Sequence, residues 1–234
     1  MRKVDNIYNL NLFDFENDAA AVEKILTDKC IKTVGFIYFS RFVDLDSDPN
    51  YLAALQHLDL VLLDGIGMQI YFKCLNGVSL SNLNGTDLMP KLIQAAYEQK
   101  CPISFYGTSQ SSVEKCAEKH GSIDYYQDGF SPLNWDRVEN NSMLIVGLGT
   151  PKQEKFVFDN REKISEKNLT VISVGGYFDF CSGVYKRAPK IIRDMKLEWL
   201  FRSLFSLAHA RRYLKNFYIF YLPLKHWYYQ RFKF

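Results

Sequence analysis

The sequence predicts an α/β fold, a Rossmann-like and mostly parallel sheet with helices on both faces. Four short apolar runs each end in a glycine turn, and helix-like stretches lie between them. That alternation is typical of a parallel sheet with helices packed against it. The chain has 234 residues and is 47% hydrophobic, which is enough apolar material for one large domain with its own core.

The expected strands are the four apolar runs, at residues 58–67, 102–109, 142–150 and 169–179. The stretch 32–42 is expected to form a further strand, and the residues before it a strand or loop that leads into a helix. Parallel sheets bind ligands at the carboxyl ends of their strands. All four glycine turns would lie there, so we expect the functional site at that edge.

The expected helices lie at residues 19–29, 86–100, 111–121 and 151–165. Leu88, Leu92 and Ala96 recur at helical spacing in the second of them. Gly121 suits the C-terminal cap of the third helix, and Pro151 suits the first turn of the fourth.

Composition excludes several other classes of protein. The chain contains 18 Phe, 15 Tyr and 3 Trp, which is too much apolar surface for a disordered protein. Five cysteines without a C-x-x-C pair do not make a disulfide scaffold, and they predict reduced thiols in a cytoplasmic protein. The N-terminus shows no apolar signal region. No run of about 18 apolar residues occurs, so we expect no membrane-spanning helix.

Charge is unevenly distributed along the chain. Residues 199–234 contain seven Lys or Arg, no Asp or Glu and thirteen aromatic residues, whereas residues 1–198 carry a net charge of −4. Cations mixed with Trp and Tyr suit the headgroup region of a membrane. Single-stranded nucleic acid uses the same residue types, but the composition favours a membrane surface. We therefore expect a main domain at 1–195 and a basic aromatic appendage at 196–234.

Asp64 stands at the end of an expected strand, where its carboxylate would point into the ligand crevice. Gly65 and Gly67 after it would let a ligand approach the backbone. The carboxylate is either a general base or the cap of the next helix. Thr86 and Asp87 begin another expected helix, where capping is the simplest role and ligand binding the alternative.

Two further glycine turns offer groups that suit a phosphate. Gly147 and Gly149 lead into a helix whose first turn contains Gln153 and Glu154, and helix N-termini attract phosphate oxygens. Gln153 would add a neutral amide donor. Gly107 ends another strand in the same way. The chain lacks the full G-x-G-x-x-G spacing and any G-x-x-x-x-G-K-[ST] motif, so a Walker-type NTPase is not predicted.

The segment 174–189 is richer in functional residue types than a plain turn requires. Gly175 and Gly176 are adjacent, Asp179 would accept a hydrogen bond from a ribose or uracil, and Arg187 would neutralise a diphosphate. An Asp–Arg surface pair is the alternative.

The sequence predicts neither a metal site nor a serine hydrolase site. The four histidines are expected on helix faces or in the appendage, none at ligand spacing with Asp, Glu or Cys, so neither a metal site nor a bound cofactor is predicted. They are His57, His120, His209 and His226. No G-x-S-x-G occurs either, which leaves serine hydrolase chemistry without its nucleophile motif.

Taken together, these motifs resemble the WecG/TagA/CpsF family of bacterial glycosyltransferases from about residue 50 to residue 213. DGIG, GTDLM, FYG, GLGTPKQE, VGGYFDFCSG, KRAP and LEWLFR stand in the order and spacing of that family. The resemblance implies an inverting, metal-independent enzyme that moves a sugar from a UDP-sugar to a polyprenyl-diphosphate-linked acceptor. The sugar is of the N-acetylmannosamine or glucose type, and the pathways make teichoic acid or exopolysaccharide. It also implies a C-terminal helical appendage that docks on the inner face of the cell membrane.

The resemblance assigns roles to single residues. Asp64 matches the family's catalytic base, and Gln153 matches a residue of the donor pocket. Arg202 and Arg212, with Arg211 beside the latter, match appendage arginines that engage the acceptor diphosphate. The family commonly has an arginine where this chain has Asn82, so one candidate diphosphate cation is missing.

Two other functions stay open. The first is a nucleotide-sugar oxidoreductase, which would use the same type of sheet, although the dinucleotide glycine motif is incomplete. The second is a non-catalytic scaffold of a polysaccharide assembly complex, which the replacement of a family arginine by Asn82 allows. Self-association of the chain also stays open.

Overall fold

The computed structural model describes residues 1–121, 123–185, 187–189, 191–192, 201 and 214–232. Within these ranges eight strands form one sheet in the order β1-β2-β4-β3-β8-β7-β5-β6, in which β1 alone runs antiparallel to its neighbour. The strands are β1 (Arg2–Lys3), β2 (Leu12–Asp14), β3 (Thr33–Tyr38), β4 (Leu60–Asp64), β5 (Ile103–Gly107), β6 (Tyr125–Gln127), β7 (Met143–Gly147) and β8 (Thr170–Ser173). The predicted mostly parallel α/β sheet is confirmed.

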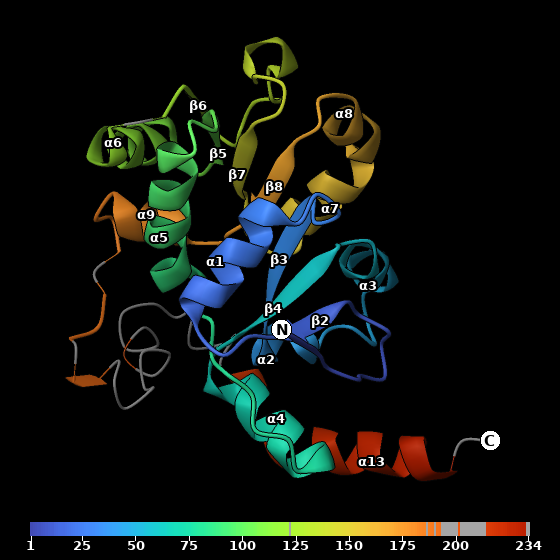
Figure 1. Ribbon diagram of the computed structural model, residues 1–234. Coiled ribbons are helices and arrows are strands. Elements are labelled where there is room, and N and C mark those ends of the chain that lie inside the picture. Colours follow the sequence, from blue (N-terminus) through green and yellow to red (C-terminus); the bar gives the residue numbers. More distant parts are fainter. Residues whose placement is uncertain (122, 186, 190, 193–200, 202–213, 233–234) are drawn as a thin grey trace.

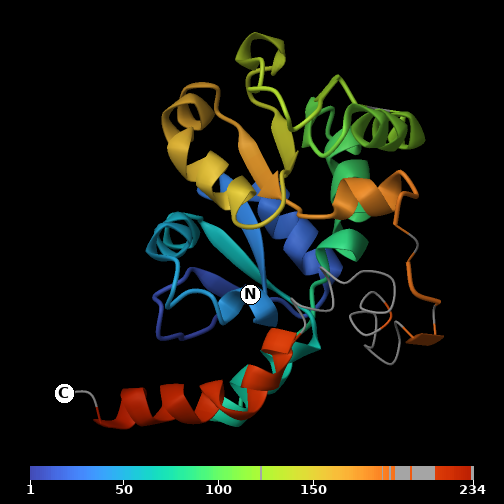
Figure 2. The ribbon, with the colours of Figure 1, turned by 180° about the vertical axis from the view of Figure 1, so that it is seen from behind.

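Helices cover both faces of the sheet. One face carries α1 (Asp18–Thr27), α5 (Gly85–Glu98), α6 (Gln110–His120) and α9 (Tyr177–Cys181). The other carries α2 (Phe39–Phe42), α3 (Pro49–Gln56), α4 (Ile66–Asn76), α7 (Lys152–Asp159) and α8 (Arg161–Glu166). Figure 1 shows α1 in front of the sheet, and Figure 2 shows the opposite face with the gold α7 and α8 toward the viewer. Two separate hydrophobic cores therefore lie above and below the strands.

Local sequence explains where these elements begin and end. The central strands β4, β5 and β7 read as continuous apolar runs because both of their faces are buried. Side chains of Asn17, Asp48 and Ser109 accept hydrogen bonds at the starts of α1, α3 and α6. Gly77 and Gly121 adopt left-handed conformations that end α4 and α6, as predicted for Gly121.

Two expected elements differ from the structure. The strand expected at 32–42 ends at Tyr38, and the chain turns into α2, which buries Phe39 and Phe42 against the core of that face. The helix expected at 151–165 is divided into α7 and α8 at Asn160. The Asn160 side chain donates to the carbonyl oxygen of Phe156 at 2.8 Å, a local bond that competes with continuation of the helix.

The C-terminal segment 214–232 packs beside α4. It forms the 3₁₀ helix η2 (Lys215–Phe220) and α13 (Leu222–Phe232), which lies next to α4 in Figures 1 and 2. Lys215 is ion-paired with Asp44. The Tyr71 hydroxyl and Nδ1 of the buried His226 lie 2.5 Å apart. No helix among the described residues is both long and apolar enough to cross a membrane.

Candidate active site

The glycine turns lie along one edge of the sheet. They follow β4, β5, β7 and β8, which run in the same direction, so that their carboxyl ends meet at that edge, as predicted. Asp64 is the last residue of β4 and pairs in register with Tyr38, the last residue of β3. The Asp64 side chain is half-buried. A carboxylate therefore stands where a ligand of such a sheet would bind.

Two asparagines hold the backbone around Asp64. Asn84 donates through Nδ2 to Oδ1 of Asp64 at 3.2 Å, and its own Oδ1 accepts from the Thr86 amide at 2.9 Å. Asn84 is thus the cap of α5, in place of the expected Thr86 or Asp87. Asn82 accepts from the Gly65 amide at 2.6 Å. The residue that replaces the expected arginine therefore fixes the turn that follows Asp64.

Gly65, Gly149 and Gly175 leave open space beside the backbone. Their φ angles are +88°, +77° and +56°, a region that favours glycine. Among the residues that the structure describes, no atom beyond the chain neighbours lies within 4 Å of a Cβ built at any of the three, and a Cβ built at Gly176 meets only the Phe180 ring. These turns have room for a ligand against the backbone.

Gly67, Gly107 and Gly147 are glycines for a different reason. A Cβ on Gly67 would lie 2.6 Å from Cβ of Phe39. One on Gly107 would meet the Gly147 carbonyl of the neighbouring strand, and one on Gly147 would lie 2.5 Å from the Phe178 ring. Close packing of helices and strands explains these three positions. Binding of a ligand at them stays a prediction.

Gln153 joins two of the turns. Its Nε2 donates to Oε1 of Glu154 at 2.9 Å, and its Oε1 accepts from the Gly175 amide at 2.9 Å. Thr150 also donates to Oε1 of Glu154, at 3.1 Å. Gln153 and Glu154 are both buried. The side chain expected to donate to a phosphate is therefore engaged in holding the turn after β8.

Glu154 is a carboxyl group inside the protein. Its burial raises the pKa to about 7, although the hydrogen bonds from Gln153 and Thr150 oppose the rise. Neither its Oε2 nor the buried hydroxyl of Tyr51 has a hydrogen-bond partner among the described residues. This side chain is therefore protonated for a large part of the time near neutral pH.

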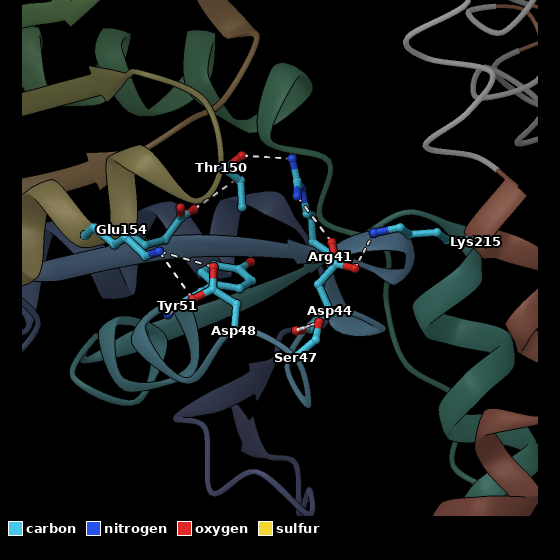
Figure 3. A network of polar contacts seen from close by, with 9 residues as sticks. Arg41, Asp44, Ser47, Asp48, Tyr51, Thr150, Glu154 and Lys215 are labelled. Atoms are coloured by element: carbon cyan, nitrogen blue, oxygen red, sulfur yellow. Dashed lines mark hydrogen bonds and ion pairs between the residues drawn. The ribbon is translucent and has the colours of Figure 1, made fainter.

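Arg41 connects this network to the helices under the sheet edge. Its guanidinium donates to the carbonyl oxygen of Thr150 at 3.0 Å and to Asp44 at 3.2 Å. Figure 3 shows Arg41 between Thr150 and Asp44, with Lys215 of the C-terminal segment on the far side of Asp44. Ionic and hydrogen-bonded contacts thus run from the turn after β7 to η2.

The acidic and basic residues of the segment 174–189 have partners other than each other. Asp179 accepts from the Thr108 hydroxyl at 2.5 Å, which ties α9 to the end of β5. Arg187 forms an ion pair with Asp87 at the start of α5, also at 2.5 Å. The sequence left open that Arg187 forms a surface ion pair with an aspartate. Arg187 does form an ion pair, but its partner is Asp87 and not Asp179. Arg202, Arg211 and Arg212 lie outside the described residues.

One cluster of side chains contradicts the expectation about histidine spacing. Cys116, His120 and Cys181 place their potential ligand atoms within 4.8 Å of one another. Cys116 and His120 are four residues apart on α6, and Cys181 ends α9. The helix brings the first two to one face, and only the packing of α6 against α9 adds the third.

The sequence singled out neither Asn84 nor Arg41 as a functional residue. Asn84 directly precedes the GTDLM motif, and an asparagine before a helical pattern is a capping signal that also locates the contact with Asp64. Arg41 carried no comparable signal, because it lies in a stretch expected to be strand. Its partner Thr150 is 109 residues away.

The fold and the site define an α/β enzyme with a carboxylate and open glycine turns gathered at the ligand-binding edge of a parallel sheet. The chain belongs to the glycosyl transferase WecG/TagA/CpsF family, which it matches over residues 6–129 and 135–233. It is therefore a glycosyltransferase, and the resemblance found in its motifs is confirmed.

Two curated relatives are both named N-acetylglucosaminyldiphosphoundecaprenol N-acetyl-beta-D-mannosaminyltransferase. The one from Bacillus spizizenii (strain ATCC 23059 / NRRL B-14472 / W23) is 31% identical over 178 residues, which are 71% of this chain and 68% of the relative. The one from Bacillus subtilis (strain 168) is 30% identical over 181 residues, 71% of this chain and 69% of the relative.

Proposed function

We propose that this protein transfers an N-acetylmannosamine-type sugar from a UDP-sugar to an N-acetylglucosamine linked through diphosphate to a polyprenol. The names of the two relatives support the acceptor and the transferred sugar. Asp64, at the carboxyl end of β4 beside open glycine turns, is the observation that supports the chemistry. The product would enter teichoic acid or a related cell-surface polysaccharide.

In this proposal Asp64 is the general base of an inverting transfer. An acceptor hydroxyl oxygen attacks the anomeric carbon as its proton passes to the Asp64 carboxylate. The bond from the anomeric carbon to the diphosphate oxygen breaks, and UDP leaves with the electron pair. Asn84, which donates to Oδ1 of Asp64, would hold the carboxylate in position for this step.

The donor diphosphate would lie along the open turns at Gly149 and Gly175, with Arg187 as a cation at their edge. A leaving group with this much charge is stabilised by fixed donors and cations. We propose that the transfer itself uses no metal ion. Gln153 would act by holding the Gly175 turn in place for the donor, since its Oε1 already accepts from that amide.

We further propose that residues 1–195 are the catalytic domain and that 196–234 dock on the cytoplasmic membrane surface, where the lipid acceptor resides. A set of large apolar side chains between residues 217 and 229, on η2, on α13 and at the residue that joins them, is exposed, and we call it the aromatic face. It comprises Phe217, Tyr218, Phe220, Tyr221, Leu224, Trp227, Tyr228 and Tyr229. Rings of this kind beside lysine and arginine suit the headgroup region of a bilayer. Arg202, Arg211 and Arg212 would engage the acceptor diphosphate there.

Transfer by purified protein tests the enzyme proposal. A panel of UDP-sugars would be incubated with a polyprenyl-diphosphate-linked N-acetylglucosamine acceptor, with and without EDTA. We expect turnover of UDP-N-acetylmannosamine that EDTA leaves intact. No transfer from any UDP-sugar would favour the scaffold, and NAD-dependent oxidation of a nucleotide sugar would favour the oxidoreductase.

Sedimentation with vesicles tests the docking proposal separately. We expect wild-type protein to pellet with vesicles containing anionic lipid, and a Phe217→Ser/Phe220→Ser/Leu224→Ser variant to stay in the supernatant. Phe130→Ser is the control, because Phe130 is even more exposed but lies outside the C-terminal segment. Equal pelleting of wild type and the triple variant would contradict docking through the aromatic face.

A further inference from the structure

A cluster of three metal-ligating side chains lies between α6 and α9, away from the carboxylate at the end of β4. Cys116 and His120 project from α6, and Cys181 comes from the last turn of α9. The potential ligand atoms of all three lie within 4.8 Å of one another. Cys116 is buried, while His120 and Cys181 are half-buried, so an ion could enter from solvent.

We infer that Cys116, His120 and Cys181 bind a zinc ion, with solvent in the fourth position. Two thiolates and an imidazole are ligands that zinc prefers over the alkaline earth ions. Zinc–sulfur bonds of about 2.3 Å and zinc–nitrogen bonds of about 2.0 Å put neighbouring ligand atoms roughly 3.4–3.8 Å apart. The ligand atoms, all within 4.8 Å of one another, already lie close to that spacing.

The surroundings of the cluster suit a metal site. The Tyr177 hydroxyl lies 2.6 Å from Nε2 of His120, a contact that fixes the orientation of the ring, as the outer partners of metal-binding histidines do. The packing of α6 against α9 holds all three side chains in one place before any ion arrives.

Bound zinc would join α6 to α9 immediately after the Gly175–Gly176 turn. Asp179, in the same helix as Cys181, already ties α9 to Thr108 at the end of β5. The ion would hold α9 at a second point and stabilise the folded state, because the ligands come from parts of the chain that separate on unfolding. It takes no part in the transfer step.

Cobalt titration of the reduced, chelator-treated full chain tests this site without any turnover assay. We expect one equivalent of Co²⁺ to give sulfur-to-cobalt charge-transfer absorption with the strong visible bands of tetrahedral geometry, and Zn²⁺ to abolish them. Cys181→Ser and His120→Gln should lose the spectrum. Cys30→Ser and Cys74→Ser are the matched controls, because both cysteines are exposed, and they should keep it.

The unfolding temperature gives a second readout that also reports whether each variant is folded. Zn²⁺ should raise it in wild type and in the two control variants, but not in Cys181→Ser. A reduced wild-type protein without the tetrahedral cobalt spectrum, or a spectrum that Cys181→Ser leaves unchanged, would overturn the inference. A third result would also overturn it: Cys116 and Cys181 oxidise to a disulfide, and Zn²⁺ leaves the unfolding temperature unchanged.

Discussion

Asn84 donates from Nδ2 to Oδ1 of Asp64 at 3.2 Å while its own Oδ1 accepts from the Thr86 amide at 2.9 Å. One side chain therefore caps α5 and orients the carboxylate at the end of β4. Asn84 therefore sets both the start of α5 and the position of the proposed base. A substitution at Asn84 should affect stability through the helix cap and catalysis through the contact with Asp64.

Substitution of Asn84 should separate these two roles. Asn84→Ala removes the cap and should lower the free energy of unfolding by about 1 kcal/mol. Asn84→Asp keeps a capping oxygen, so the helix cap should hold, but a like charge beside Asp64 should raise the pKa of that carboxyl and lower stability near neutral pH. The acidic limb of the rate–pH profile would then move to higher pH. An unchanged profile in Asn84→Asp would contradict a base role for Asp64.

Asn82 should matter through the turn that it holds. Asn82→Ala removes the acceptor for the Gly65 amide, a bond of 2.6 Å, and leaves that turn free to adopt other conformations. We expect transfer to fall by about tenfold or more, since a displacement of the base by a fraction of an ångström is costly. Single-turnover rates would measure it. Full activity of Asn82→Ala would contradict the prediction that the bond from the Gly65 amide to Asn82 positions the base.

Glu154 should make stability depend on pH. Its folded pKa of about 7 lies above the usual value of 4.5, so the folded state holds a proton that the unfolded state releases. Stability is then greatest at low pH and declines as pH rises through about 7, by roughly 3 kcal/mol in total.

Comparison with Glu154→Gln isolates this effect. The variant keeps an oxygen that can accept from Gln153 and Thr150, but it does not titrate. Denaturant unfolding between about pH 5 and pH 8 should show wild type losing stability relative to the variant. The exposed Glu162→Gln is the matched control, and it should follow wild type. Parallel curves for wild type and Glu154→Gln would contradict a buried, titrating carboxyl.

His226 should make the docking of α13 on α4 sensitive to acid. Burial lowers the pKa of its imidazole to about 4. The unfolded or detached segment therefore takes up a proton first, and stability is lost as pH falls from about 6.5 toward 4. The protection factors of the α13 amides, which correct hydrogen exchange for the intrinsic effect of pH, should fall over that range in wild type and not in His226→Asn. His57→Asn, at an exposed position, should behave as wild type.

Much of the sheet and of its functional edge was predictable from sequence. β4, β5, β7 and β8 are buried on both faces, so each reads as an apolar run, and a glycine at or within two residues of its end marks the turn. The short edge strand β6 carries no such run, because Tyr125, Tyr126 and Gln127 are only half-buried. Edge strands leave a weaker pattern for that reason.

The contacts that build the site were less predictable. Gln153 and Glu154 are polar residues in the first turn of a helix, a position that normally faces solvent, yet both are buried by the packing of α7 under the sheet edge. Cys116 and His120 stand at a helical spacing that could have been noticed. Cys181 is 61 residues beyond His120 in the sequence, and only the tertiary fold brings the two together.

The most direct test of the account is the rate of sugar transfer by Asp64→Asn beside wild type and Asp136→Asn. Asp136 is an exposed aspartate of the 3₁₀ helix η1 (Trp135–Arg137), so its variant controls for the loss of one carboxylate. With UDP-N-acetylmannosamine and the lipid-linked acceptor, Asp64→Asn should lose at least about 100-fold in rate while its unfolding temperature holds. Transfer by a folded Asp64→Asn at the rate of wild type would contradict the assignment of Asp64 as the base.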